Sequence, residues 1–308
     1  MTPKQLARIA VALAALLVLW GLAEMVGTGS DTTTARFDLP RLTSADVDTV
    51  KILRATDTLL LAKHADTWTV NGHLASNQAV TDLFNGLKDT SRVELVAQSP
   101  TSHAQLGVDS STGKRVELIQ GTRLVASVIV GGRGPGWQGV YARRPGEDHV
   151  YLTRADLGNV VERQLDDWRD KVVAAVEPDS VREVRVQLGR GGYTLRRGDA
   201  GWRFAGGAAA DSGEVKRMLE QYRNFQGGGF PSAAQADSLD FRRPNRRVTL
   251  VGPSAPLAEL VFDSAASWWY VQRVAGGTVY RVESWRLPQL FPADSSLRAK
   301  PDSTRAGG

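Results

Sequence analysis

The chain carries the same residue pattern twice. Trp68, in the string DTWTVNG, corresponds to Trp202, in AGWRFAG, about 134 residues further on, and Val50 corresponds to Val184 at the same offset. A repeat of this length indicates two copies of one domain rather than a solenoid of short units. Catalytic residues normally occur at one place in a protein. A domain that is duplicated without a duplicated reactive motif is therefore typical of a platform rather than of a catalyst.

The correspondence extends along most of the chain. Its offset shrinks slowly, because the first copy has a longer glycine-rich loop before Tyr141. Further corresponding pairs are Val47 and Val181, Val80 and Val215, Leu83 and Met218, Leu87 and Tyr222, Leu106 and Leu239, Val116 and Val248, Leu118 and Leu250, Tyr141 and Tyr270, and Tyr151 and Tyr280. Apolar and aromatic residues that recur in both copies are expected to lie in the two cores.

Each copy begins with alternating apolar residues, which predict a β-meander, and continues with a helix. Ser76 and Asp211 are placed to cap these helices, whose apolar residues recur every three or four positions, as at Val80, Leu83 and Leu87. Later strands are expected at 115–119, 124–130, 139–143 and 150–153, and at 247–251, 258–262, 268–274 and 278–282. We therefore expect an α+β fold of two tandem repeats, each a mostly antiparallel β-sheet with one or two packed helices.

The first 26 residues are expected to form a transmembrane helix that anchors the chain. Lys4 and Arg8 precede an apolar run from Ile9 to Ala23, and the segment is long enough to cross a thin hydrocarbon core. Positive charges before the run keep the N-terminus cytoplasmic, so we expect a single-pass protein of the bacterial inner membrane with a periplasmic C-terminal bulk. A cleaved signal peptide is the alternative, although no convincing A-x-A site follows the run.

The remaining boundaries follow from composition. The expected parts are a linker at 27–36, the first repeat at 37–165, an inter-repeat connection at 166–180, the second repeat at 181–291 and a disordered tail at 292–308. The tail is assigned because it is rich in Ala, Ser, Asp, Arg and Gly.

Most kinds of reactive site find no support in the sequence. The chain has no cysteine, which excludes disulfides and thiolate chemistry. Its four histidines lack metal-ligand spacing, and residues 134–139 match G-x-G-x-x-G but precede a strand rather than a helix. The histidines are His64, His73, His103 and His149. We expect no catalytic residue, cofactor, metal or nucleic-acid partner, and a protein that is not an enzyme.

Two groups of side chains are candidates for contact with a partner or ligand. The basic string RRPNRR is either a solvated turn or a contact with an anionic surface. An exposed tryptophan at the tip of the glycine-rich loop would suit a partner or lipid, and adjacent tryptophans in a strand must point to opposite faces. The candidate residues are Trp137, Trp268, Trp269, Arg242, Arg243, Arg246 and Arg247.

These motifs together resemble a bacterial family called domain of unknown function 4340. The resemblance rests on the basic anchor, W-x-V/F after a hairpin, LGVD at 106–109, GVYAR, VYLT and WRDK at 168–171. It covers roughly residues 40–290. It implies a membrane-anchored protein, and some members of the family accompany auxiliary components of ABC-2-type exporters, including those named for gliding motility. The resemblance supplies no catalytic residues.

The expected function is therefore that of a non-enzymatic, membrane-anchored envelope protein, an accessory or scaffold subunit of an ABC-type export system. Its expected partners are the membrane, through the N-terminal helix, and an ABC transporter permease or another envelope protein. The alternative is an extracytoplasmic binding module for an anionic lipid or polysaccharide, which would use a cleft between the two copies and the arginine clusters.

Overall fold

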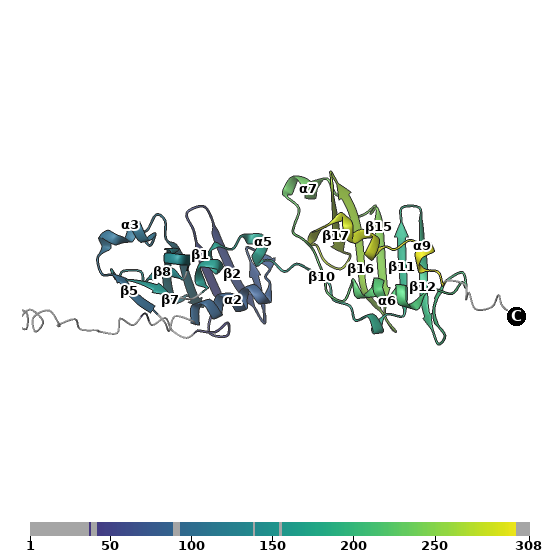
Figure 1. The fold of residues 1–308 in the computed structure, drawn as a ribbon, viewed down its shortest axis with the longest axis horizontal. Helices are drawn as coiled ribbons and strands as arrows, with labels where there is room; N and C mark the ends of the chain where they lie inside the picture. The colour runs from purple at the N-terminus through teal and green to yellow at the C-terminus, as the bar shows by residue number, and fades with distance from the viewer. Residues whose placement is uncertain (1–36, 38–41, 89–92, 138, 154–155, 300–308) are drawn as a thin grey trace, which may run out of the picture. The chain divides into compact units, whose positions relative to one another are not determined.

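The computed structural model describes residues 37, 42–88, 93–137, 139–153 and 156–299. The chain divides into two compact units, Met1–Trp168 and Arg169–Gly308 (Figure 1). The predicted anchor at 1–26 and linker at 27–36 lie outside the described residues.

In the part of the chain that the structure describes, no helix has the length and apolar character needed to cross a membrane.

The first unit is built on one antiparallel sheet. Its strand order is β4-β3-β2-β1-β6-β7-β8-β9-β5. The strands are β1 (Thr49–Leu53), β2 (Thr58–His64), β3 (Thr67–Val70), β4 (His73–Leu74), β5 (Val93–Ala97), β6 (Lys114–Gln120), β7 (Arg123–Arg133), β8 (Val140–Arg143) and β9 (Val150–Thr153). Alternate residues of these strands are buried because one face carries the main core.

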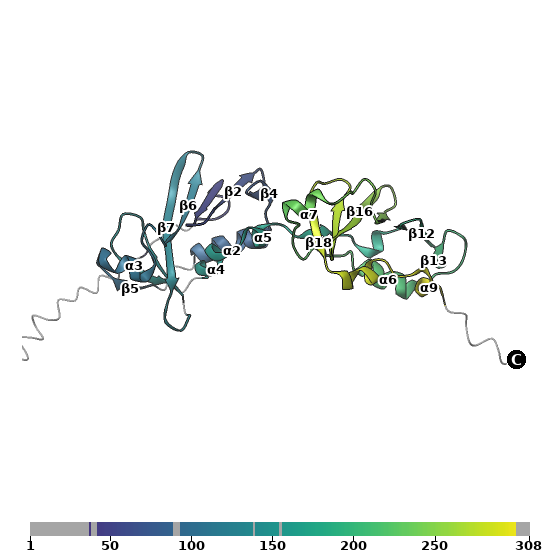
Figure 2. The ribbon, with the colours of Figure 1, turned by 90° about the horizontal axis from the view of Figure 1, so that it is seen from above.

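The core of the first unit lies between this sheet and three helices. These are α2 (Asn77–Lys88), α4 (Leu157–Glu162) and α5 (Leu165–Trp168), which lie along one side of the sheet (Figure 2). Trp68 packs 6.0 Å from the ring of Phe84, and Trp168 is fully buried. On the other face, α3 (His103–Leu106), which follows η1 (Pro100–Ser102), packs Leu106 against a smaller cluster around Ile129.

The second unit has a seven-stranded antiparallel sheet in the order β13-β12-β11-β15-β16-β17-β18. Its strands are β11 (Glu183–Leu188), β12 (Gly191–Gly198), β13 (Gly201–Phe204), β15 (Arg246–Val251), β16 (Pro256–Ala265), β17 (Trp268–Arg273) and β18 (Val279–Val282). A separate pair joins β10 (Val172–Ala174) to β14 (Phe225–Gln226). The order of strands from β13 to β18 repeats the order from β3 to β9.

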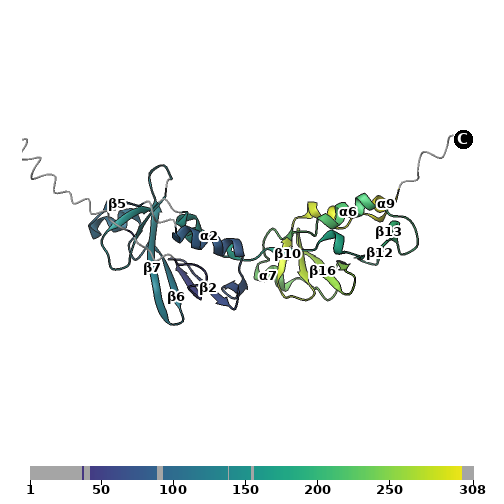
Figure 3. The ribbon, with the colours of Figure 1, turned by 90° about the horizontal axis from the view of Figure 1, so that it is seen from below.

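Helices cover both faces of the second sheet unequally. The core face carries α6 (Ser212–Glu220), α8 (Leu287–Leu290) and α9 (Asp294–Leu297), whereas α7 (Ala233–Asp237) lies on the other side (Figure 3). Asp211 caps α6 as expected, because its carboxylate accepts hydrogen bonds from the backbone N–H groups of Gly213 and Glu214. Short 3₁₀ turns occur at η2 (Pro135–Trp137), η3 (Pro178–Ser180) and η4 (Ser284–Arg286).

The structure confirms the α+β class with mostly antiparallel sheets, and it corrects one of the predicted segments. Residues 292–299 of the predicted disordered tail pack onto the second unit, where Leu297 is fully buried and its carbonyl accepts a hydrogen bond of 2.8 Å from the N–H of Asp211. The predicted connection at 166–180 contributes to both units, because Trp168 belongs to the first core and Val173 to the second. In both places a few apolar side chains anchor an otherwise polar segment.

Candidate functional site

A hollow of about 310 Å³ opens on the second sheet, on the face opposite its main core. Its floor is one cross-strand row, in which Arg247 of β15 lies opposite Val261 of β16 and Val261 lies opposite Gln272 of β17. Residues 239–242, which follow α7, form the wall, and Val274 forms the rim. We call this the basic hollow.

A buried carboxylate holds the wall of the basic hollow in place. Asp263 of β16 accepts hydrogen bonds from the backbone N–H of Asp240, at 2.8 Å, and from the side-chain amide of Asn245, at 2.5 Å. Because both donors belong to the segment between α7 and β15, Asp263 ties that segment to the sheet. The wall is therefore pre-formed rather than a loose loop.

Two guanidinium groups line the basic hollow. The side chain of Arg242 is 96% exposed and lies 3.6 Å from Asp240, whereas Arg247 forms a close ion pair with Glu259. A guanidinium presents a planar set of N–H donors that matches the oxygens of a phosphate or a carboxylate. With Leu239 and Phe241 beside them, these groups can bind an anion that also has an apolar part.

The structure separates the four arginines of RRPNRR. Arg246 points to the core face, where its guanidinium lies 4.7 Å from the ring of Trp269 and 5.4 Å from that of Phe291, and burial lowers its pKa. Arg243 is exposed and does not line the basic hollow. The string therefore supplies two contact residues, Arg242 and Arg247, and one residue that packs against the core.

Trp268 and Trp269 also take different places. Trp269 packs against the second core, and Trp268 is 40% exposed, with the guanidinium of Arg281 at 4.6 Å from its ring. Next on the strand, Tyr270 is buried, and burial raises its pKa. Its hydroxyl has no hydrogen-bond partner among the described residues. Of the two tryptophans, Trp268 is the one that remains available to a partner.

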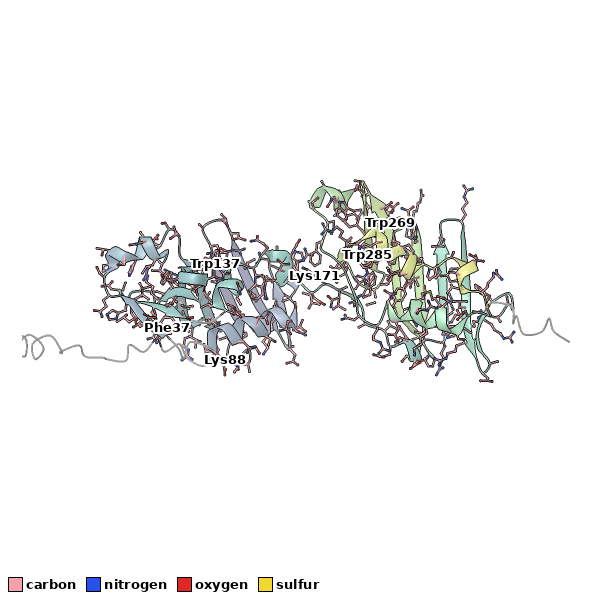
Figure 4. The ribbon with its side chains drawn as sticks, viewed as in Figure 1. Phe37, Lys88, Trp137, Lys171, Trp269 and Trp285 are labelled. Carbon is pink, nitrogen blue, oxygen red and sulfur yellow. The ribbon has the colours of Figure 1, made fainter. Side chains whose placement is uncertain are left out.

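Trp137 lies in the first unit, whereas the arginines of RRPNRR lie in the second. It stands at the tip of the loop between β7 and β8, is 79% exposed, and has the guanidinium of Arg133 at 5.7 Å from its ring (Figure 4). Trp285 of the second unit is 66% exposed and was not singled out in the sequence. The local sequence SWR has no periodic pattern, so it does not show whether Trp285 is buried or exposed.

The first unit has a hollow of about 200 Å³ at the corresponding place. Its floor is again part of a cross-strand row, in which Arg115 lies opposite Ile129. Where the second unit has Arg242, this hollow has Asp109, whose carboxylate accepts hydrogen bonds from the hydroxyl groups of Ser111 and Thr112. These bonds hold the pKa of Asp109 well below its ordinary value.

The described residues contain no group of three metal-ligating side chains. Three of the four histidines lie on the surface, and the fourth, His103, is partly buried, with its Nε2 2.9 Å from the carbonyl oxygen of Asp148. The arrangement that the structure does provide is a pair of hollows, each lined by two arginines and one aspartate.

Comparison with known proteins adds a family. The sequence model described as "Domain of unknown function (DUF4340)" matches residues 68–244, more than half of the chain. The match runs from β3 of the first unit to the segment between α7 and β15 of the second. No curated protein and no solved structure gives a significant match.

Proposed function

The chain belongs to the family DUF4340, and we propose that it acts as a membrane-anchored, non-enzymatic accessory or scaffold subunit of the bacterial envelope. The proposed partner is the permease of an ABC-type exporter or another envelope protein. Residues 1–26 form the proposed single-pass anchor, with the rest of the chain on the periplasmic side, because Lys4 and Arg8 precede the apolar run.

The observation that carries this proposal is the repeated architecture of the two units. Trp68 lies opposite Lys63, and at the same place in the second unit Trp202 lies opposite Arg197. With the shared strand order, this register supports a tandem repeat of one domain. Such a repeat provides two comparable surfaces on one chain, which is what a scaffold requires.

Exposed tryptophans support the same function. Trp137 and Trp285 each present most of a large apolar ring to solvent, and tryptophans are enriched among the residues that dominate protein interfaces. Each tryptophan also lies near a guanidinium, that of Arg133 or Arg286.

Affinity purification of the full-length protein from its native membrane in mild detergent tests the proposal. Mass spectrometry should find a transporter permease or another envelope protein in stoichiometric amount, and Trp137→Ala should reduce its recovery. Recovery of the protein alone, under conditions that preserve other membrane complexes, would contradict an accessory role.

The basic hollow favours a second function, which is binding of an anionic envelope ligand. Arg242 and Arg247 line it, and the carboxylate nearest to Arg242 is 3.6 Å away. Titration of the full-length protein with inorganic phosphate should give saturable binding that Arg242→Gln weakens. Binding that the substitution leaves unchanged would contradict this function.

A further inference from the structure

We propose that the basic hollow binds the head group of an amphiphilic anion whose alkyl chain lies in a neighbouring apolar hollow. This inference rests on the anionic-ligand function proposed above and adds the class of ligand. The head group is a phosphate or a carboxylate, and it meets Arg242 and Arg247. The alkyl chain of the ligand lies among residues 173–176, 256–259 and 273–275 of the protein. These residues line a second hollow of about 430 Å³, which we call the apolar hollow.

The two hollows are neighbours, since Val274 lines both. A second link is Glu259, which lines the apolar hollow and forms the ion pair with Arg247 of the basic hollow. A ligand that passes over the side chain of Val274 therefore reaches from one hollow into the other. This geometry suits a molecule with a charged end and an apolar end.

The apolar hollow exposes apolar side chains to solvent, and covering them with a ligand is favourable in free energy. Leu257 is 43% exposed and Val274 is 51% exposed, while Val173 and Ala174 form a buried wall behind them. Apart from Glu259 and Arg273, every residue that lines this hollow is apolar or alanine. An alkyl chain in it would remove apolar surface from water, and that transfer is favourable.

The charges near the rim favour an anion. Three arginines, Arg242, Arg247 and Arg273, line the two hollows, against two carboxylates, those of Asp240 and Glu259. Arg273 donates to the carbonyl oxygens of Val172 and Val173, at 2.9 and 2.6 Å, and has no salt bridge among the described residues. The exposed contact between Arg242 and Asp240 is weak enough for a ligand to replace it.

The corresponding hollow of the first unit places its charges differently, because Arg54, one of its two arginines, is only 7% exposed and forms an ion pair with Asp57. The motif LDFR, which ends at Arg242, corresponds to LGVD, which ends at Asp109. Asp109 thus places a carboxylate where the second unit places a guanidinium, and it repels an anion. We therefore assign the ligand to the second unit alone.

The test uses the full-length chain in nanodiscs of phosphatidylcholine. The protein is titrated by calorimetry with inorganic phosphate and with ethyl, butyl and hexyl phosphate, each below its micelle concentration. Empty nanodiscs titrated in the same way are the control. Affinity should rise about threefold to fourfold for each added methylene, as long as the alkyl chain still fits the apolar hollow. Hexanoate carries a carboxylate head group in place of the phosphate of hexyl phosphate. Hexyltrimethylammonium has the same alkyl chain with a positive head group, and it should not bind.

Substitutions in the protein distinguish the contribution of the ligand's alkyl chain from that of its anionic head group. Leu257→Asp should abolish the dependence on chain length and keep phosphate binding, whereas Leu124→Asp, at an exposed leucine in the matching hairpin of the first unit, should change nothing. Arg242→Gln should weaken every anion by a similar factor, and Arg243→Gln should not.

The outcomes distinguish this inference from the function on which it rests. Phosphate binding without chain-length dependence would overturn the amphiphilic ligand and keep the anionic one. Absence of binding for every anion would overturn both. Equal binding of hexyl phosphate and hexyltrimethylammonium would overturn the role of the arginines.

Discussion

Val50 of β1 lies directly opposite Leu118 of β6. The pair that corresponds to it in the second unit, Val184 and Leu250, lies opposite in the same way across β11 and β15. A slip of one residue in either unit would turn every side chain to the other face of its sheet. Equal register, rather than a shared class of fold, is therefore what supports two copies of one domain.

Trp202→Ala should destabilise the second unit by about 3–5 kcal/mol, because it removes a large buried ring from the core. Urea unfolding followed by hydrogen exchange reports each unit separately. The first unit should be unaffected, and Trp68→Ala should give the reverse pattern. Equal loss of protection in both units from either substitution would contradict two separate cores.

Gly131→Ala should destabilise the first unit by about 1–3 kcal/mol through overpacking. A methyl group at this position would come 2.4 Å from the carbonyl oxygen of Leu106 and 2.9 Å from the carbonyl carbon of Gly107, and neither is free to move like a side-chain end. The neighbouring Gly132→Ala is the control, because its nearest contact is 3.5 Å. Equal melting temperatures for the two variants would show that α3 does not pack closely on β7.

Arg246→Gln and Arg242→Gln should have opposite effects, although both replace an arginine of RRPNRR. Arg246 packs on Trp269 and Phe291, so its loss should lower the free energy of unfolding by about 1–2 kcal/mol and leave anion binding intact. Arg242 is exposed, so its loss should weaken binding with little change in stability. Chemical unfolding and phosphate titration of both variants check the contrast.

The turn at Asp109 should lose stability at acidic pH. The hydroxyl of Ser111, then that of Thr112, lowers the pKa of the Asp109 carboxyl in the folded chain. A lowered folded pKa means that the stabilisation is present above the unfolded pKa of about 3.9 and is lost as the pH falls below it toward the folded pKa. Carbon-13 NMR should place the midpoint well below 3.9, and Ser111→Ala should raise it. A midpoint of 3.9 in the unsubstituted chain would contradict these hydrogen bonds.

Periodicity predicted most of the strands and both main helices, because each has one face on a core. It missed β4, β10 and β14, which have only two or three residues, and β5, where Val96 breaks the apolar–polar alternation of the sequence. It also missed the packed end of the chain, where Leu297 is a lone apolar anchor in a polar segment. Composition alone cannot reveal a segment that one buried side chain and a few backbone hydrogen bonds hold in place.

The site was only partly predictable. The string RRPNRR drew attention to the right segment, but Arg246 and Arg247 are the first two residues of β15 and so point to opposite faces. The role of Val261 and Gln272 depends on the register of the hairpin that β16 and β17 form, and apolar alternation alone does not fix that register. The same holds for Val274, which only the fold places between two hollows.

The most direct test of the proposed function is photo-crosslinking in the native membrane. A photoreactive residue is placed at Trp137 or Trp285 of the full-length protein, and at exposed Leu124 as a control. The proposed function predicts that the tryptophan positions capture one envelope protein reproducibly, identified by mass spectrometry as a transporter permease or another membrane component, and that position 124 does not. The same background of products at all three positions would contradict a scaffold that contacts its partner through these tryptophans.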